Sequence, residues 1–197
     1  MAEIKKSSHK NAARSRYLIK QAFAQLTNEK DLQKITVTDI VERANISRGT
    51  FYAHYLDVYD LCVAIQKNAI ETIDSAIEEM GIENILHDPT EATVRGMKFL
   101  DMNKTYFKLF VTSSFSDSLV DRIINRIEDK FTERIGEVFP ANEKNELEFF
   151  VCYILGAYKN IILYWFKHTT EMTSDQCAQE LAKLYMKARP AAFEKAE

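Results

Sequence analysis

Apolar residues recur along almost the whole chain at the spacing of amphipathic helices. In four segments, residues 19–26, 37–44, 61–77 and 119–135, they stand three or four positions apart and so share one helical face. No stretch shows a convincing alternation with the period of two that marks a half-buried strand. The pattern therefore predicts an all-α protein of about nine helices.

Glycine and proline set the expected helix boundaries. A long helix over residues 59–80 ends near Gly81, and Pro89 suits the first turn of the next helix, which runs to about Met102. Further helices are expected over residues 14–26, 106–111, 142–167 and 178–185.

Composition indicates a folded chain in a reducing compartment. Hydrophobic residues make up 46% of the chain and aromatic residues 11%, enough to bury a core. The first residues include lysines and no apolar run, so no signal peptide is expected. Cys62, Cys152 and Cys177 are far apart and lack any zinc-binding spacing, which predicts a cytoplasmic protein without a metal or another cofactor.

The most apolar run, residues 149–166, is expected to form a buried helix and not to enter a membrane. Lys159 and Asn160 interrupt it, and its longest clean piece of about ten residues is half the roughly 20 that a span needs. A helix that is apolar on so many sides would be covered by its own domain on one side and by a twofold partner on the other.

The net charge of −3 conceals an asymmetry along the chain. Residues 1–55 carry ten Lys and Arg against five Asp and Glu, a charge of +5, whereas residues 56–197 carry a charge of −8. A basic segment joined to an acidic one suggests that only the basic segment meets a polyanion, although solvated lysines would give the same count.

Residues 35–55, ITVTDIVERANISRGTFYAHY, predict two short helices joined by a tight turn. Thr36 is a suitable N-cap, and Asp39 at the third helical position favours the helix dipole. Asn45 fits the left-handed position that ends the first helix, and Ser47 then caps the second.

The second of these helices is rich in hydrogen-bond donors. Arg48, Thr50, Tyr52 and His54 are expected to point away from the core, and no carboxylate occurs over residues 47–56. An ordinary helical corner facing water is the alternative, but such a surface is normally built from Glu and Lys. The composition favours phosphates and base edges as partners, as for a helix in the major groove of DNA.

The segment TVTDIVERANISRGTFYAHYLDVYDL resembles the helix-turn-helix signature of the tetracycline-repressor (TetR) family of bacterial transcription regulators. The matching residues are Ile40, Ala44, Ser47, Gly49, Thr50, Tyr52, His54 and Leu61, with Ile46 and Tyr55 as near equivalents. The resemblance implies a three-helix DNA-binding domain over residues 1–58 and a helical ligand-binding and dimerisation domain over residues 59–197. It also implies a symmetric homodimer, a double-stranded DNA operator and a small-molecule effector.

Carried over by position, the resemblance assigns DNA contacts to the recognition helix and to the start of the helix before it. The residues are Thr36, Thr38, Ser47, Arg48, Gly49, Thr50, Tyr52 and His54. Val58 stands where the family usually has a phosphate-binding lysine. The basic residues Lys5, Lys6 and Lys10 of the N-terminal tail are therefore expected to supply the missing charge.

The chain after residue 104 is more loosely similar to a subgroup of the family that includes regulators linked to dihydroxyacetone kinase. An apolar effector pocket with a few hydroxyl groups is expected from Phe99, Met102, Tyr106, Phe107, Phe110, Tyr153 and Tyr158. The alternative for this aromatic group is an ordinary core. A four-helix dimer interface is expected from Ile161, Ile162, Trp165, Ala178, Leu181 and Tyr185.

Enzymatic motifs do not stand out in the sequence. Its four histidines are scattered without a Glu-x-x-His or His-x-x-x-His spacing, and it has no P-loop or dinucleotide-binding glycine motif. The leading interpretation is therefore a ligand-responsive transcription regulator, more often a repressor than an activator, and not an enzyme. The alternative is a helical ligand-binding or protein-interaction module that no longer binds DNA, which Val58 favours.

Overall fold

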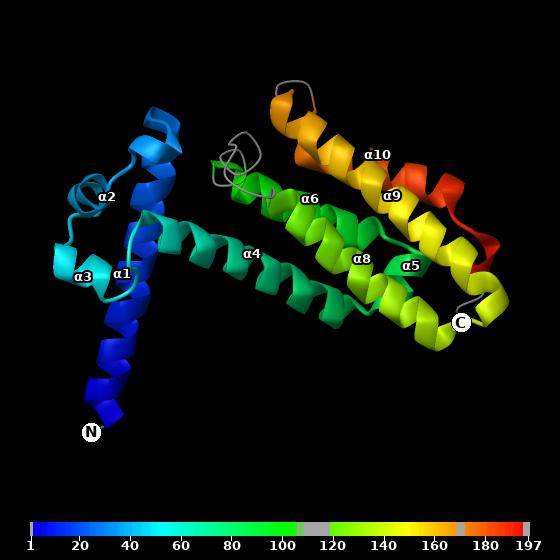
Figure 1. The fold of residues 1–197 in the computed structure, drawn as a ribbon, viewed down its shortest axis with the longest axis horizontal. Coiled ribbons are helices and arrows are strands. Elements are labelled where there is room, and N and C mark those ends of the chain that lie inside the picture. Colours follow the sequence, from blue (N-terminus) through cyan, green and yellow to red (C-terminus); the bar gives the residue numbers. More distant parts are fainter. Residues whose placement is uncertain (1, 106, 108–118, 169–171, 195–197) are drawn as a thin grey trace. The chain divides into compact units, whose positions relative to one another are not determined.

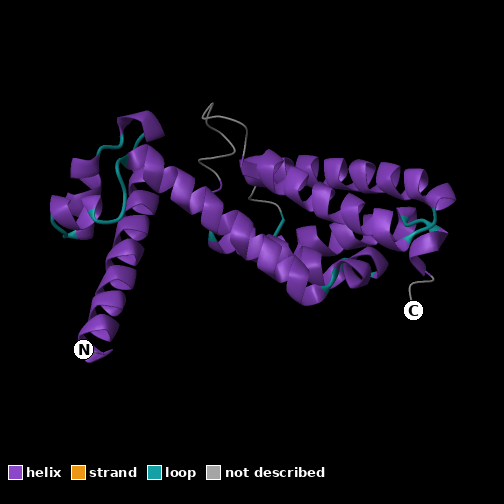
Figure 2. Ribbon diagram, turned by 60° about the horizontal axis from the view of Figure 1, so that its bottom comes forward, coloured by secondary structure: helices purple, strands orange, loops and turns teal. Residues whose placement is uncertain are grey.

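The computed structural model describes residues 2–105, 107, 119–168 and 172–194, with side chains over the part of these ranges between residues 11 and 193. These residues form α-helices and two 3-10 turns and contain no strand, which confirms the predicted all-α class (Figures 1 and 2). The helices are α1 (Ala2–Glu29), α2 (Val37–Ala44), α3 (Arg48–Tyr52), α4 (Val58–Met80), α5 (Ile82–His87), α6 (Thr90–Met102), α8 (Leu119–Val138), α9 (Ala141–Lys167) and α10 (Ser174–Ala188).

The chain forms two compact units, which we call the head (Met1–Ala69) and the body (Ile70–Glu197). Helix α4 is continuous through the division and contributes to both. The domain boundary expected after residue 58 falls at the start of α4, and the functional division at that residue stays a prediction.

The turn between α2 and α3 forms as the sequence predicts, because its backbone groups are capped locally. Thr36 Oγ1 accepts the Asp39 N–H at 3.2 Å, and Asp39 Oδ2 accepts the Thr36 N–H at 2.8 Å, a capping box. Asn45 is left-handed, with φ 51° and ψ 51°, and Ser47 Oγ accepts the Thr50 N–H at 3.0 Å.

Helix α1 is longer than the apolar pattern predicts, since it begins at Ala2 and not near residue 14. Its first turns are polar and lack the stripe on which the prediction depended. Ion pairs tie the end of α1 and the next residue to α2. Arg43 donates to both carboxylate oxygens of Glu29 at 2.7 and 2.6 Å, and Lys30 pairs with Asp39 at 2.7 Å.

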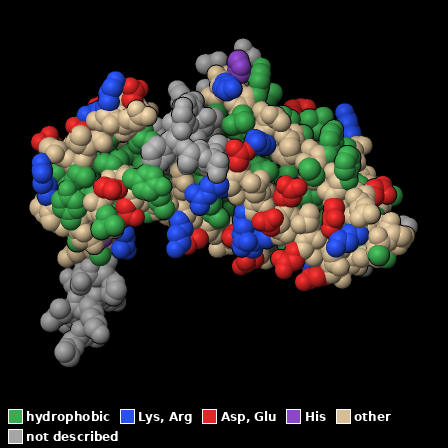
Figure 3. Space-filling view, in the orientation of Figure 1, with side chains coloured by type: hydrophobic (Ala, Val, Ile, Leu, Met, Phe, Trp, Pro, Cys, Tyr) green, Lys and Arg blue, Asp and Glu red, His purple; other side chains and the backbone are tan. Residues whose placement is uncertain are grey.

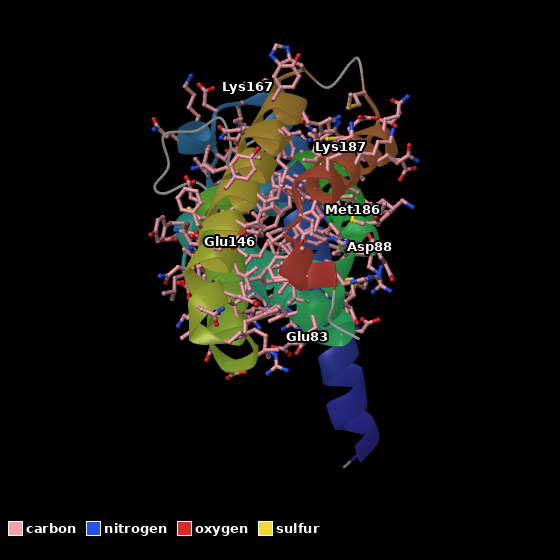
Figure 4. The ribbon with its side chains drawn as sticks, turned by 90° about the vertical axis from the view of Figure 1, so that its right-hand side faces the viewer. Glu83, Asp88, Glu146, Lys167, Met186 and Lys187 are labelled. Atoms are coloured by element: carbon pink, nitrogen blue, oxygen red, sulfur yellow. The ribbon has the colours of Figure 1, made fainter. Side chains whose placement is uncertain are left out.

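The body is built from two helix pairs with α4 against them. Helix α8 packs mainly on α9, and α10 packs mainly on α6. Side chains fill the space between the pairs in Figure 4, where Glu146 and Lys167 mark two positions along α9. Acidic and basic side chains lie intermixed over one face of the body in Figure 3. Ion pairs join α4 to α8. Of these pairs, Arg126–Asp74 spans 3.1 Å and Lys130–Glu78 spans 2.9 Å.

One helix and one helix boundary in the body differ from the predictions. Helix α5, six residues long, was not predicted, because so short a segment shows no periodicity. Pro89 is the N-cap of α6 and not part of its first turn, and the Asp88 carboxylate accepts the Thr90 N–H at 2.9 Å. The helix expected over residues 106–111 lies, except for residue 107, outside the described residues.

Acid should weaken the head through Asp39. Lys30, and after it the Thr36 N–H, lower the pKa of this carboxyl from 3.8 to about 2. A lowered folded-state pKa stabilises the head above pH 4, and the contribution is lost as the pH falls from about 4 towards 2. Hydrogen exchange of the α2 amides should therefore be slower in the wild type than in Asp39→Asn at pH 5. That difference should shrink by pH 2.5. An equal difference at both pH values would contradict the pairing.

Candidate nucleic-acid interface and ligand cavity

Helix α3 presents a surface that contrasts sharply with its buried side. Phe51 is fully buried beneath the helix, whereas Ser47, Arg48, Gly49 and Tyr52 are exposed, Tyr52 to 53%. The helix is only five residues long, so this single buried ring decides which side faces outward. The exposed side carries cationic and neutral donors together, as the sequence predicts.

The Arg48 side chain is held in position by the neighbouring helix. Its Nη2 donates to Thr38 Oγ1 at 2.8 Å, and Thr38 is half-buried in the first turn of α2. A guanidinium has five N–H donors, so this bond leaves others for a ligand. Both residues were predicted to contact DNA, but the bond between them depends on the angle between α2 and α3, which the sequence pattern does not show.

The hydroxyl groups of Thr36, Ser47 and Thr50 are engaged in helix capping. Thr36 Oγ1 donates to Asp39 Oδ2 at 2.8 Å, and the Ser47 and Thr50 hydroxyls lie 2.9 Å apart. Their observed role is to fix the shape of the turn. Their contacts with DNA stay predictions.

His54 differs from the expectation that it points away from the core. Its Nε2 lies 2.6 Å from Ser15 Oγ of α1, and the ring is half-buried. Burial, and after it the charge of Arg16, lower the pKa of His54, which favours a neutral ring. The side chain thus fastens the segment after α3 to α1. The physical reason is the path of α1, which the local pattern around residue 54 does not contain.

Carboxylates next to this surface are held by backbone amides. Asp60 Oδ2 accepts the Leu56 N–H at 2.9 Å, and Asp57 Oδ1 accepts the Asp60 N–H at 2.7 Å. Leu56, which is 80% exposed, and Val58, which is half-buried, are both apolar residues. Neither position therefore supplies a cation. The side chains of Lys5, Lys6 and Lys10 lie outside the described residues.

Gly49 leaves open space on the exposed side of α3. A Cβ at this position would meet only Ser47 Oγ, at the ordinary contact distance of 3.7 Å, so the fold itself does not require glycine there. Glycine costs helix propensity relative to alanine. A reason from outside the chain, such as the close approach of another backbone, would account for it.

A cavity of about 330 Å³ lies in the body between α4, α5, α6, α8, α9 and α10. Its walls are almost entirely apolar and include five isoleucines from α4 and α8. These isoleucines are Ile73, Ile77, Ile123, Ile124 and Ile127. The volume lies in the range of small-molecule sites, and the apolar walls fit a ligand rather than a cluster of waters.

The predicted pocket residues divide into four groups. Phe99 and Tyr158 line the cavity. Phe107 is buried against Phe99 and Phe166 but does not line the cavity, which agrees with the alternative of ordinary core. The predictions for Met102 and Tyr153 are corrected, since these side chains are 87% and 60% exposed on the outer faces of α6 and α9. Tyr106 and Phe110 lie outside the described residues.

Polar groups of the cavity are few and already paired. Thr93 Oγ1 and Tyr158 OH are 3.0 Å apart, joining α6 to α9. Burial raises the pKa of Tyr158 to about 12, so its hydroxyl stays neutral near pH 7. Arg95 is the one charged residue among the described residues that line the cavity. Its guanidinium is held at the rim by Glu91 at 2.6 Å and Glu79 at 3.2 Å.

Helix α9 carries a second apolar face, which the described part of the chain leaves exposed. Phe149, Cys152, Tyr153 and Tyr164 are exposed along it, and Gly156 lies at its centre, where a Cβ would meet nothing within 4 Å. By length and composition α9 alone among the described helices could cross a membrane, and a third of its most apolar window is buried. An uncovered apolar face of this kind marks a surface that needs a partner.

The predicted interface residues lie elsewhere in the structure. Trp165, Ala178, Leu181 and Tyr185 are buried in the core of their own chain, which corrects their assignment to a surface between two chains. Ile162 lines the cavity, and Ile161 is half-buried. Because both faces of α9 are apolar, its sequence alone could not show which one points inward.

Comparisons with known proteins identify relatives for most of the chain. Residues 87–187, just over half of it, match the TetR-type family described as "Transcriptional regulator C-terminal region". An HTH-type transcriptional regulator of Staphylococcus aureus, SAR0097, is 26% identical over 175 residues, which is 82% of this chain and 86% of that protein. An HTH-type transcriptional regulator of Bacillus subtilis, YxbF, is 36% identical over 74 residues, covering 36% of this chain and 20% of that protein.

Solved structures share the fold at lower identity. The dihydroxyacetone kinase operon activator DhaS aligns with a TM-score of 0.66 at 18% identity, over 89% of this chain and 96% of that one. A TetR-family regulator from Syntrophomonas wolfei aligns with a TM-score of 0.64 at 18% identity, over 90% and 96%. Another from Streptococcus agalactiae aligns with a TM-score of 0.59 at 20% identity, over 93% and 98%.

Glycine substitutions should show which open spaces are real. Gly49→Ala and Gly96→Ala should keep or raise the free energy of unfolding, by up to about 1 kcal/mol, because alanine favours helix and neither Cβ meets a close neighbour. Gly81→Ala, the matched control, should lower it by about 1–2 kcal/mol because φ is +78° there. Thermal unfolding followed by circular dichroism measures all three. If Gly96→Ala were as destabilising as Gly81→Ala, the space beside Gly96 would not be open.

Proposed function

The chain belongs to the TetR family of transcriptional regulators, and from this membership we propose that it is a ligand-responsive repressor that binds a palindromic operator as a homodimer. It acts in the cytoplasm on double-stranded DNA and has no catalytic role. The observation that carries the proposal is the exposed face of α3, where Arg48 is held by Thr38 beside the open Gly49.

Base readout falls to Arg48 and Tyr52, and close approach of the DNA falls to Gly49. An arginine already fixed by one hydrogen bond loses little side-chain entropy when its remaining donors bind a guanine edge. The absence of a side chain at residue 49 lets the phosphate backbone of a DNA strand approach the start of α3. Thr36, Ser47 and Thr50 position the phosphate backbone, and the tail residues Lys5, Lys6 and Lys10 add sequence-independent attraction.

The partner of the uncovered α9 face is a second copy of the chain. In a twofold arrangement the same face meets itself, and residues at its centre lie on the axis. Gly156 stands midway between Phe149 and Tyr164, and its lack of a side chain allows two helices to approach closely. A membrane is the weaker alternative, since Lys159 and Asn160 lie in the middle of α9.

The cavity is the effector site, and α4 transmits its state. Residues of α4 line the cavity, and the same helix continues without a break into the head. A ligand regulates only to the extent that it binds two positions of α4 with unequal affinity. Ion pairs between α4 and α8 hold one of these positions.

Replacing Arg48 should abolish specific recognition. Arg48→Ala should weaken binding to a duplex selected from random DNA by at least about thirtyfold, since each half-site loses roughly 1–3 kcal/mol. Arg122→Ala, a cation of the body, should have little effect on the same binding curve. Fluorescence anisotropy measures both. Unchanged affinity of Arg48→Ala would remove base readout by this residue. Failure of the wild type to select any sequence would favour a module that no longer binds DNA.

Charge on the α9 face should separate the dimer. Phe149→Asp should sediment as a monomer at micromolar concentration, whereas Met102→Asp, an equally exposed apolar residue outside this face, should remain a dimer. A wild-type monomer, or a protein that stays in solution only with detergent, would contradict the second copy as partner.

A crosslink at Cys152 gives an independent check. Cys62 and Cys177 are buried, and Cys152 is exposed four residues from Gly156. If the twofold axis crosses antiparallel α9 helices at Gly156, the two Cys152 residues lie roughly 12–15 Å apart. A bismaleimide of that span should join wild-type chains, and Cys152→Ser should prevent this.

A further inference from the structure

The arrangement of polar groups in the cavity indicates what kind of ligand fits it. We propose that the effector is a neutral, mainly apolar small molecule with one hydroxyl or carbonyl group, which binds at the Thr93–Tyr158 pair. The inference rests on the proposed effector role of the cavity and adds the chemical class of the ligand. It also assigns separate parts to Tyr158, Gly96 and Arg95.

The volume of the cavity and its apolar walls determine the size and position of the apolar part of the ligand. At the roughly 30 Å³ that a water molecule occupies in the liquid, 330 Å³ holds about ten to fifteen non-hydrogen atoms. Gly96 is three residues after Thr93 on α6, so both lie on one helical face, and a Cβ at residue 96 would meet nothing within 4 Å. The apolar part of the ligand therefore occupies the space beside Gly96.

The polar part of the ligand binds at the Thr93–Tyr158 pair. The Thr93 and Tyr158 hydroxyls are bonded to each other, and each of the two can make further hydrogen bonds. Tyr185 also lines the cavity, but its hydroxyl already donates to the Leu86 carbonyl at 2.6 Å. A hydroxyl or carbonyl group of the ligand therefore finds both a donor and an acceptor at the junction of α6 and α9.

Charged ligands are excluded by how Arg95 is paired. Its guanidinium is bound by Glu79 of α4 and Glu91 of α6, so the charge is already compensated at the rim. A carboxylate would have to compete with these two acidic groups and would otherwise lie unpaired against apolar walls, at high cost. An ammonium would find no carboxylate among the described residues that line the cavity.

A series of ligands with equal chain length tests this class directly. Isothermal titration of the full-length wild type with 1-decanol, decanoate and decylamine should show binding of the alcohol, with both ions at least tenfold weaker. Tyr158→Phe should bind decanol about threefold to tenfold more weakly, the effect of one lost hydrogen bond. Gly96→Leu should abolish decanol binding while its unfolding temperature shows that it is folded.

Removing the charges of Glu79 and Glu91 at the rim should strengthen the binding of an anionic ligand. Glu79→Gln combined with Glu91→Gln should release Arg95 and strengthen decanoate binding, whereas Glu133→Gln on α8 should not. Wild-type binding of decanoate as tight as that of decanol, or binding of none of the three ligands, would overturn the inference. Operator binding is measured in parallel. Operator binding without decanol binding would contradict the proposed ligand class and leave the proposed DNA binding intact. Decanol binding without operator binding would support the ligand class and contradict the proposed DNA binding.

Discussion

The burial of one ring, Phe51, determines which side of α3 faces outward, and this is the surface proposed to bind DNA. A helix of five residues is too short to be stable by itself, so α3 exists only because its buried side is fixed. Phe51 is fully buried and lies 5.8 Å from the Tyr55 ring, which is itself buried. With that side fixed, Arg48, Gly49 and Tyr52 can face only outward. The left-handed Asn45 and the cap at Ser47 then set the angle at which they do so.

The helices of the body leave a cavity inside and an exposed apolar face outside. The inner space is bounded by six helices, and one of them, α4, is shared with the head. A ligand that fills this space adds contacts that the empty cavity lacks. The outer face of α9 in turn needs a partner before the molecule is fully covered. The proposed ligand site and the proposed dimer face therefore lie on opposite sides of one helix, α9.

Local features could be predicted from the sequence, and features that depend on helix rotation could not. Thr36, Asn45 and Ser47 act within three or four residues of themselves, so their roles could be predicted from residue types alone. The role of His54 depends on Ser15, 39 residues away. In α9, Tyr153 and Tyr158 look alike in the sequence, yet one faces outward and the other lines the cavity. Because α9 has a second apolar face, the pattern of apolar residues does not show which face points inward.

The most direct test of the central claim, that the α3 face reads DNA, is the salt dependence of binding to DNA flanking the protein's own gene. Binding is followed by anisotropy from about 50 to 200 mM salt, beside a scrambled duplex of equal length. The account predicts that the flanking DNA binds at least a hundredfold more tightly than the scrambled duplex. Its log affinity should fall linearly with log salt, with a slope steeper than about −3, as for four or more neutralised phosphates. Equal affinity for both duplexes at every salt concentration would contradict it.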